Sequence, residues 1–441
     1  MHRLASVGLR LPRLRPDLSP FRDSRDLRLV VGGGFVSNLG SQATLVALPF
    51  QLYLLTGSAL MVGLLGAAEL IPLVSMSLLG GAIADRMDRR RLLLLTQIGL
   101  VTTSGALAIL PALGRPPVAA LYVLGGLLAG ANALQNVAMS AILPNLIDRP
   151  RLPRVLAVTY GLSALATVMG PGFGGLLIAA FGVQAAYAVD AVSCLAVVGT
   201  VLCIAAQPPI AVGEHPKVLA SIAEGLRYVR GNSALVGSFA IDLVAMTFGM
   251  PRALFAVLAV SVFHAGAAGT GALYAAVPAG ATVAALLTGW INHARRLGIV
   301  VIWAVAVWGA AVVLAGLMRS LWPAVALLAV AGAADSISAV CRSTINQTVT
   351  PDHMRGRMSS VFSLVVTGGP RLGDIEAGSV AGATGVRFSV VSGGLLCVVG
   401  VGVIALAFPA LRHYDTADWT TAPDAGTAQR IGETVEAVEL T

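Results

Sequence analysis

Charged residues are scarce in this chain of 441 residues: Asp, Glu, Lys and Arg together make up only 11% of it. Soluble domains usually contain about 25% of these residues. Hydrophobic residues make up 56%, and the mean hydropathy is +0.84. A chain with so few charges does not have the composition of a soluble domain. The composition therefore predicts an integral membrane protein.

Aromatic residues and cysteines are also few, at 5% and four residues respectively. The cysteines all lie in apolar stretches and none belongs to a CxxC pair, so we expect small core residues rather than disulfides or metal ligands. In contrast, the chain contains 50 glycines. Small residues let membrane helices approach one another closely. This composition is typical of a tightly packed helical bundle.

Sequence motifs of common enzymes and metal sites are absent. We find no Walker A sequence, no GxSxG and no pair of histidines spaced for zinc. The sequence therefore predicts neither an enzyme nor a bound cofactor or metal. The net charge of +8 lies in loops between apolar stretches, which favours membrane orientation over binding of nucleic acid.

Twelve apolar segments recur along the chain, each long enough to cross a hydrocarbon core of about 30 Å. The predicted spans are 29–54, 59–84, 92–113, 117–142, 155–181, 183–206, 234–262, 266–291, 298–318, 321–348, 358–383 and 386–410. If both termini are cytoplasmic, twenty-three basic residues fall on the cytoplasmic side and three fall outside. Basic residues favour the cytoplasmic side, so this bias predicts a multi-pass plasma-membrane protein with both termini inside.

The longest internal loop, 207–233, divides the spans into two sets of six. It contains Leu219, Ile222, Leu226 and Val229 at helical spacing, which predicts an amphipathic helix on the cytoplasmic face. The predicted organisation is a basic N-terminal tail, two six-helix halves separated by this loop, and a C-terminal tail. Their boundaries are 1–28, 29–206, 207–233, 234–410 and 411–441.

A short charged turn lies between the second and third spans, at Gly81 to Arg91. It resembles the loop motif of major facilitator superfamily transporters, G-x-L-a-D-R-x-G-R-[RK]. Asp88 stands where glycine is usual. The resemblance implies that Asp85 helps to hold the cytoplasmic side closed. The matching positions are Gly81, Ile83, Ala84, Asp85, Arg86, Arg89 and Arg90.

The fifth span contains Gly170-Pro171-Gly172-Phe173-Gly174-Gly175, which resembles the G-P-x-x-G-G motif of antiporters in the same superfamily. Proline removes a backbone hydrogen bond, and glycines let a neighbouring helix come close. The resemblance implies the hinge of an exporter; the alternative is a packing motif in a kinked helix. The halves also echo one another, since Gly369-Pro370 and Gly289 to Arg296 repeat the two motifs in the second half.

Several ionisable residues fall inside the predicted spans, where an unpaired charge is costly, so each should face the protein interior or a partner. Asp335 and Arg342 share one helix face and could pair with each other or with Asp242. A buried carboxyl group can bind and release a proton near neutral pH, as proton antiport requires. The proposed coupling residues are Glu69, Asp242, Asp335 and Arg342. Further candidates are Asp190, Arg252, Arg371, Asp374 and Glu376.

Some of these candidates also have structural explanations. Asp190 could simply hydrogen-bond to a neighbour, and Asp335 with Arg342 could be a structural pair. Arg371, Asp374 and Glu376 could neutralise one another. The fourth span has no arginine of the R-x-x-Q-G type found in many proton antiporters, so that proton relay cannot be transferred to this chain.

The segments Phe248–Leu254 and Thr350–Met358 resemble the branch of the superfamily that contains enterobactin exporters and macrolide and multidrug efflux proteins. The resemblance implies a monomeric all-α transporter with twelve transmembrane helices in two pseudo-symmetric halves. We expect proton-driven export of a small amphipathic molecule, such as a macrolide or a siderophore. The alternatives are an uptake permease or lysolipid flippase on the same fold, and a non-transporting receptor or scaffold.

Overall fold

The protein is described by a computed structural model that covers residues 19–207, 218–287 and 296–415. All regular structure in these residues is helical. The helices of the first half are α2 (Arg25–Thr56), α3 (Ala59–Arg86), α4 (Arg89–Ile109), α5 (Val118–Ile142), α6 (Leu152–Phe181) and α7 (Val183–Leu202). Those of the second half are α9 (Ser233–Phe248), α10 (Leu254–Val257), α11 (Gly266–Leu287), α12 (Leu297–Leu317), α13 (Leu321–Val349), α14 (Arg355–Thr384) and α15 (Val386–Ala407).

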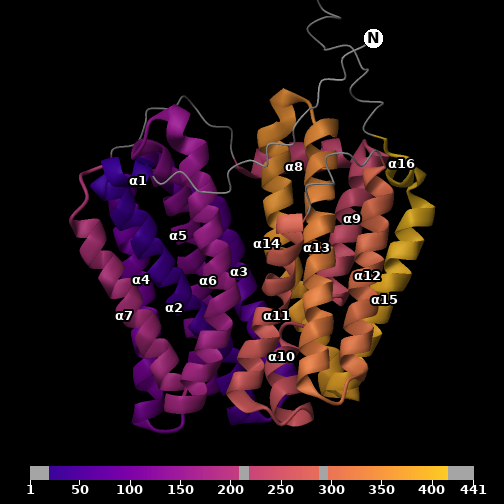
Figure 1. Cartoon of the computed structure of the whole chain (residues 1–441), viewed down its shortest axis with the longest axis horizontal. Coiled ribbons are helices and arrows are strands. Elements are labelled where there is room, and N and C mark those ends of the chain that lie inside the picture. The colour runs from indigo at the N-terminus through magenta and orange to yellow at the C-terminus, as the bar shows by residue number, and fades with distance from the viewer. Residues whose placement is uncertain (1–18, 208–217, 288–295, 416–441) are drawn as a thin grey trace, which may run out of the picture.

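The two sets of helices form two groups that lie side by side, from indigo to magenta and from orange to yellow (Figure 1). The first and last described residues lie at the same end of the molecule, the top in Figure 1. The groups approach each other most closely toward the opposite end (Figure 1). Below, the upper end is called the terminal end and the lower one the distal end.

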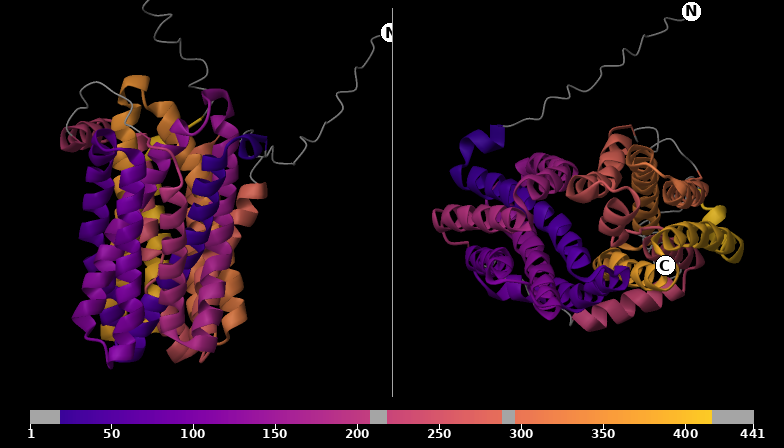
Figure 2. Two further views of the ribbon diagram at one scale, coloured as in Figure 1. Left: turned by 90° about the vertical axis from the view of Figure 1, so that its left-hand side faces the viewer. Right: turned by 90° about the horizontal axis from the view of Figure 1, so that it is seen from below.

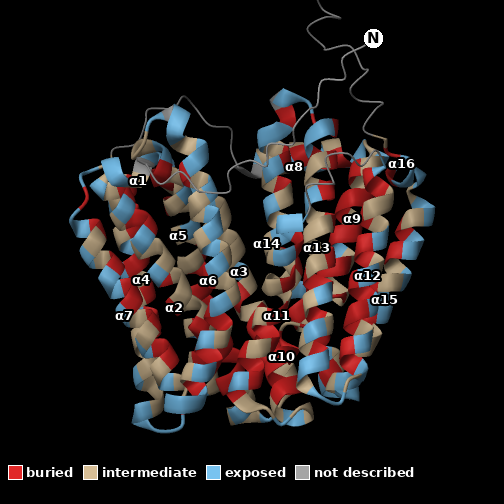
Figure 3. Ribbon diagram, in the orientation of Figure 1, coloured by how far each residue is buried: buried red, intermediate tan, exposed pale blue. Residues whose placement is uncertain are grey.

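Ten of the described helices are long and apolar enough to cross a bilayer. The remaining two predicted spans correspond to α14, which contains Arg371, Asp374 and Glu376, and to α9 with α10. Buried residues gather along the inner faces and around α10 and α11, whereas exposed residues lie on the outer faces and at both ends (Figure 3). Apolar outer faces are expected where helices contact lipid.

The seventh predicted span is not one continuous helix, so the prediction of an unbroken segment over 234–262 was wrong. Its first part, α9, ends at Phe248, and α10 begins only at Leu254 before a π-helical turn over Leu258–Val262. The cause is Pro251, which cannot donate a backbone hydrogen bond and disfavours helical geometry in the residue before it. The Trp308 indole N–H donates to the free carbonyl of Gly249 at 2.8 Å.

The N-terminal boundary also needs correction, because helical structure begins before residue 29. A short helix, α1, covers Ser19–Asp23, and α2 begins at Arg25. The Ser24 hydroxyl accepts a hydrogen bond from the Leu27 amide at 3.2 Å, which caps α2. Leu27 is fully buried, so this first turn belongs to the packed bundle.

The amphipathic helix predicted in the central loop is α8 (Val218–Arg230). The chain turns by 110° between α8 and α9, which places α8 across the terminal end of the bundle (Figure 2). Glu224 forms a 2.7 Å ion pair with Arg357 of α14, and the Tyr228 hydroxyl donates to the Val349 carbonyl of α13 at 3.0 Å. Burial raises the pKa of Tyr228, so it remains a neutral donor. The helix is thus fastened to the second half.

Two pairs of glycines bring the halves together near the distal end. A Cβ atom added at Gly63 of α3 would lie 2.6 Å from the Cα of Gly378 in α14. One added at Gly175 of α6 would lie 2.8 Å from the Cα of Gly271 in α11. These helices therefore contact backbone to backbone, which only glycine permits. The two seams close the distal end between the halves.

Candidate substrate cavity between the two halves

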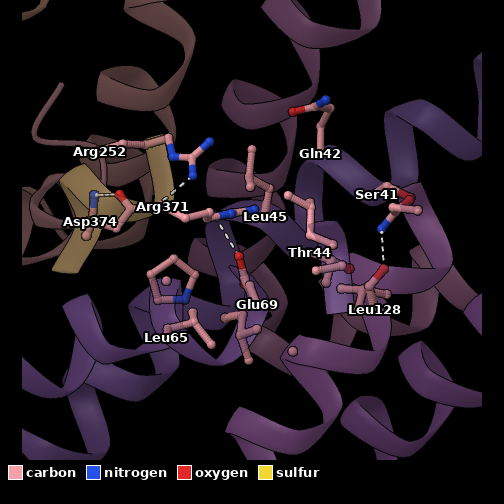
Figure 4. A pocket seen from close by; sticks show the side chains of 18 of the residues that line it. Ser41, Gln42, Thr44, Leu45, Leu65, Glu69, Leu128, Arg252, Arg371 and Asp374 are labelled. Carbon is pink, nitrogen blue, oxygen red and sulfur yellow. Dashed lines mark hydrogen bonds and ion pairs between the residues drawn. The ribbon is translucent and has the colours of Figure 1, made fainter. Parts of the chain in front are cut away.

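A cavity of about 260 Å³ lies between the two halves and receives side chains from both. Helices α2, α3 and α5 supply one wall. The opposite wall comes from the α9–α10 break, α11 and α14, through Arg252, Ala253, Tyr274, Arg371 and Asp374. Figure 4 shows several of these side chains converging. Major facilitator transporters bind substrate at such an interface near the bilayer midplane.

The wall from the first half combines apolar side chains with polar ones, and all of its polar side chains except Glu69 are uncharged. Asn38, Ser41, Asn132 and Asn136 line both this cavity and an adjoining one of about 120 Å³. The adjoining cavity extends toward the terminal end, where α6 contributes Thr159 and other residues. Side-chain amides and hydroxyls can both donate and accept hydrogen bonds. The route from the cavity toward the terminal end is therefore suited to a molecule rich in hydrogen-bonding groups.

Four charged residues meet in the cavity and join the halves. Arg371 of α14 forms a 2.6 Å ion pair with Glu69 of α3 and a 3.4 Å contact with Asp374. Arg252 forms a 2.9 Å ion pair with Asp374 (Figure 4). The cluster holds two acids and two bases, so its formal charges cancel. The bond between Glu69 and Arg371 is the one that crosses from one half to the other.

Asp374 also stabilises the break in the seventh span. Its carboxylate accepts a 3.0 Å hydrogen bond from the backbone N–H of Ala253, at the start of α10. Carboxylates are favourable at helix N-termini because they satisfy free N–H groups and interact with the helix dipole. Irregular backbone inside a membrane protein must be satisfied in this way. The broken helix therefore brings Arg252 into the cavity and holds it there.

A second charged cluster lies within the second half. Arg342 of α13 forms ion pairs with Asp242 of α9 and, at 3.7 Å, with Asp335 of its own helix. This grouping is the one predicted from the helical spacing. Asp242 and Arg342 are both buried. The cluster holds one more acid than base, so it carries a formal charge of −1 unless a proton is bound.

Asp190 of α7 lies in the first half and is fully buried. Its carboxylate accepts hydrogen bonds from the hydroxyls of Ser41 at 3.0 Å and Thr44 at 2.8 Å, both on α2. It also accepts one from Ser104 of α4 at 2.7 Å. Asp190 has no ion-pair partner among the described residues. These contacts are of the kind that the structural alternative for Asp190 described, and its three hydroxyl partners come from two other helices.

The charged turn of the loop motif forms hydrogen bonds with other parts of the first half. Arg90 donates to the carbonyls of Val201 and Leu202 at the end of α7, at 2.9 and 2.6 Å, and Arg89 donates to Asn145. Asp88 accepts a bond from the Arg91 amide at 3.1 Å and caps α4, which explains an acid at the usual glycine position.

The other positions of this motif differ in how they pack. A Cβ atom at Gly81 would meet nothing within 4 Å, whereas one at Gly80 would lie 3.1 Å from Leu134 of α5. The glycine that packs closely against α5 is thus Gly80, which precedes the motif position Gly81. Asp85 and Arg86 are exposed at the terminal end of α3.

The glycine motif of the fifth span packs against two different helices, and α6 continues through Pro171 without a break. Gly170 and Gly174 face α2, where a Cβ at Gly174 would lie 2.6 Å from the Ala43 Cα. Gly175 faces α11 across the boundary between the halves. The counterpart Gly369 packs against Met246 of α9, so the two halves use the repeated motif in the same way.

Sequence reasoning missed the pairing across the halves. It grouped Arg371 and Asp374 with Glu376, but Glu376 forms no ion pair in the described part of the chain. The principal partner of Arg371 is Glu69, which lies in the other half of the sequence. Two residues so far apart along the chain can be paired only once the helices of the two halves are placed against each other. The counterpart motif, Gly289 to Arg296, lies outside the described residues except for Arg296.

Comparison with known proteins places the chain in a family. Residues 16–436 match the model of the transmembrane secretion effector family of the major facilitator superfamily. The chain is 31% identical over 421 residues to the enterobactin exporter EntS of Escherichia coli O9:H4, covering 92% of this chain and 98% of the relative. The corresponding protein of Citrobacter koseri is 31% identical over 410 residues, covering 90% and 95%.

Solved structures show the same fold. The nucleoside transporter NupG matches with a TM-score of 0.68 and 13% identity, covering 88% of this chain and 100% of the other. A bacterial homologue of the human lysosomal transporter Spinster, in an inward-facing and unoccupied conformation, matches with a TM-score of 0.69 and 15% identity, covering 88% and 98%. The predicted major facilitator fold is confirmed, and the predicted absence of enzymatic activity agrees with a family of transporters. The chain belongs to the transmembrane secretion effector family of the major facilitator superfamily.

Proposed function

We propose that this transporter exports a small amphipathic molecule of the siderophore type across the plasma membrane in exchange for protons. The observation that supports this best is the cavity between the halves, whose wall combines apolar side chains with uncharged polar ones and whose charged residues are paired. An amide- and hydroxyl-lined wall suits a ligand with many phenol, hydroxyl and amide groups. The names of the curated relatives, enterobactin exporters, support the same class of substrate.

The cavities reach toward the terminal end, while the glycine seams close the distal end. With both termini in the cytoplasm, as the distribution of basic residues predicts, this is an inward-facing state that can receive substrate from the cytoplasm. Export then requires the seams to part and the terminal ends to close. In that state the loop motif, including Asp85 and Arg86, is proposed to hold the cytoplasmic side closed.

Proton coupling is proposed to use the acids within the spans. The cluster of Asp242, Asp335 and Arg342 has one acid in excess, which a bound proton would balance. Asp242→Asn is expected to abolish proton-driven export while the protein still folds, because Arg342 keeps Asp335 as a partner. Unchanged export by this variant would remove Asp242 from the coupling mechanism.

The function is tested by expressing the chain in an Escherichia coli strain that lacks its own enterobactin exporter. We expect enterobactin to appear in the medium, and a protonophore to stop its release. Arg371→Ala, which removes a charged cavity residue but leaves the loops intact, should not restore release. Erythromycin accumulation in the same cells tests the macrolide alternative. Inverted vesicles under an imposed proton gradient separate export from uptake. An exporter should move enterobactin into these vesicles. If enterobactin instead moves out of them, the chain is an uptake permease.

A further inference from the structure

The interior of the first half contains two acids and no base. Among the residues of α2 to α7 that lie between the charged ends of these helices, the ionisable acids and bases are Glu69 and Asp190 alone. Glu69 is neutralised by Arg371 of the other half. Asp190 is fully buried, and no arginine, lysine or histidine of the described residues pairs with it. It is thus the acid of this half without a compensating charge.

The surroundings of Asp190 consist of hydroxyl and thiol groups. Ser41 and Thr44 approach from α2 and Ser104 from α4, at 2.7–3.0 Å, and Cys194 of α7 lies 3.7 Å away. Neutral hydroxyls lower the cost of a buried carboxylate but do not supply the opposite charge that the membrane interior favours. Among the titratable groups of the packed helices, Cys194 bonds to Ser37 and Tyr187 bonds to Gln51. None of these groups brings a positive charge.

Asp190 is nevertheless connected to the substrate cavity. Ser41 and Thr44, two of its three hydroxyl partners, line that cavity. We propose that Asp190 exchanges a proton during transport. Through Ser41 and Thr44, the binding of substrate then depends on whether Asp190 is protonated. This inference deepens the proposed function and rests on it.

The coupling follows from the number of protons available. A hydroxyl has one proton to donate and two lone pairs. While Asp190 is ionised, Ser41 and Thr44 donate to it and present only lone pairs to the cavity. A phenol O–H or an amide N–H of a substrate can then donate to them.

When the proton binds at Oδ1 of Asp190, which has Ser41 as its hydroxyl partner, the new O–H donates to the Ser41 hydroxyl oxygen. The hydrogen bond now runs from Asp190 to the hydroxyl oxygen, where before it ran from the hydroxyl to Asp190. It occupies one lone pair of that oxygen, and the hydroxyl proton points away from Asp190. The substrate loses an acceptor, so the bound proton and a hydrogen-bond-donating substrate compete. Competition between the two is what an antiporter requires: one proton is released as substrate binds, and one is taken up after substrate leaves.

The surroundings favour a proton over a metal cation. Sodium and the larger cations need several oxygen ligands arranged around an ion-sized space. Here the carboxylate oxygens already accept hydrogen bonds at 2.7–3.0 Å, and Asp190 has no exposed surface.

The test uses the full chain reconstituted in lipid, with enterobactin as the probe and a pH indicator in weakly buffered solution. We expect the Asp190→Asn variant to release about one proton fewer than the unmodified protein on binding enterobactin, and its affinity to depend less on pH. It should lose accumulation driven by a proton gradient but keep exchange of enterobactin between two equal pools. Ser193→Ala is the matched control, because this buried hydroxyl donates to the Asp190 backbone carbonyl and not to its carboxylate.

A second variant, Ser41→Ala with Thr44→Val, keeps the carboxyl group and removes its link to the cavity. We expect enterobactin binding by this variant to release fewer protons, even if Asp190→Asn folds poorly. Full proton release and proton-driven accumulation in both variants would overturn the role of Asp190, as would accumulation that follows a sodium gradient instead. If the unmodified protein itself fails to move enterobactin under a proton gradient, the proposed function fails first.

Discussion

At the scale of single residues, the charges in the described interior of this transporter, apart from Glu376, form three groups with different balances. The cavity cluster is neutral, the group around Arg342 has one excess acid, and Asp190 has only hydroxyl partners and a thiol. A paired charge stabilises a given arrangement of helices, whereas an unbalanced acid can respond to protons. The ion pair between Glu69 and Arg371 joins the two halves. Of the ion pairs described here, it is therefore the one that motion of the halves would disturb most.

Glu69→Gln is expected to weaken the closed distal end. Arg371 retains Asp374 at 3.4 Å, so the protein should fold, but it loses the charge that links it to α3. The separation of the halves can be measured by spin-label distances between the exposed distal positions Leu113 and Phe388, with Cys203 replaced by Ser. The variant should show a larger population at long distance than the unmodified protein. An unchanged distance distribution would show that this ion pair does not control the closed state.

The ion-pair partner of a buried charge could be predicted from the sequence only where both residues lie on the same helix. The spacing of Asp335 and Arg342 is visible along one helix, so their grouping was predicted. The partnership of Glu69 with Arg371 requires knowing which face of α3 meets α14, and that is set by the glycine contacts between the halves. Charge inside a span could therefore be read as interior-facing, but the partner could not be named from the sequence.

At the scale of elements, glycines and a broken helix shape the contacts that matter for transport. Helices α3 and α6 each meet a helix of the other half through paired glycines. Between them, α10 begins after a break capped by Asp374. The number and type of helices could be predicted from apolar length, but the break could not, since many membrane helices tolerate a proline such as Pro251.

Gly175→Ala is expected to prevent complete closure of the seam between α6 and α11. The new methyl group would lie 2.6 Å from the Ala267 carbonyl oxygen, so backbone must shift. Transport should fall strongly. Gly172→Ala, in the same motif, is the control, because a Cβ there meets nothing within 4 Å. Equal transport by both variants would contradict a role for the close contact.

Trp308→Phe tests the break in the seventh span. It removes the donor to the Gly249 carbonyl, and an unsatisfied buried polar group costs about 1–3 kcal/mol. We expect a lower thermal unfolding temperature in detergent. Trp303→Phe on the same helix is the control, since Trp303 is 68% exposed. A similar loss of stability in both variants would indicate a general effect of removing tryptophan.

At the scale of the whole molecule, the threading through the bilayer determines which side the cavity faces. The placement of basic residues predicts that the terminal end is cytoplasmic. In the structure both described ends of the chain lie there (Figure 1). The adjoining cavity extends toward the same end. If the terminal end is cytoplasmic, as predicted, the structure is an inward-facing state.

The threading can be checked by labelling single cysteines in intact cells. Arg115→Cys, at the distal end, should react with an impermeant thiol reagent added outside. Arg91→Cys should react only after permeabilisation. Both arginines lie on predicted loops of opposite sides. Arg115 donates an exposed hydrogen bond to the Leu55 carbonyl, and the loss of such a surface contact should cost little stability. The reverse labelling pattern would invert the direction in which the cavity faces.

The attachment of α8 has a mechanical consequence. Its bonds to Val349 and Arg357 fix it to α13 and α14, so it must travel with the second half when the halves rock. If α8 lies on the membrane surface, as its amphipathic sequence predicts, it moves along the lipid headgroups in every transport cycle. Lipids that bind it more tightly in one state would lengthen the time the protein spends in that state, so membrane composition would affect the rate of transport.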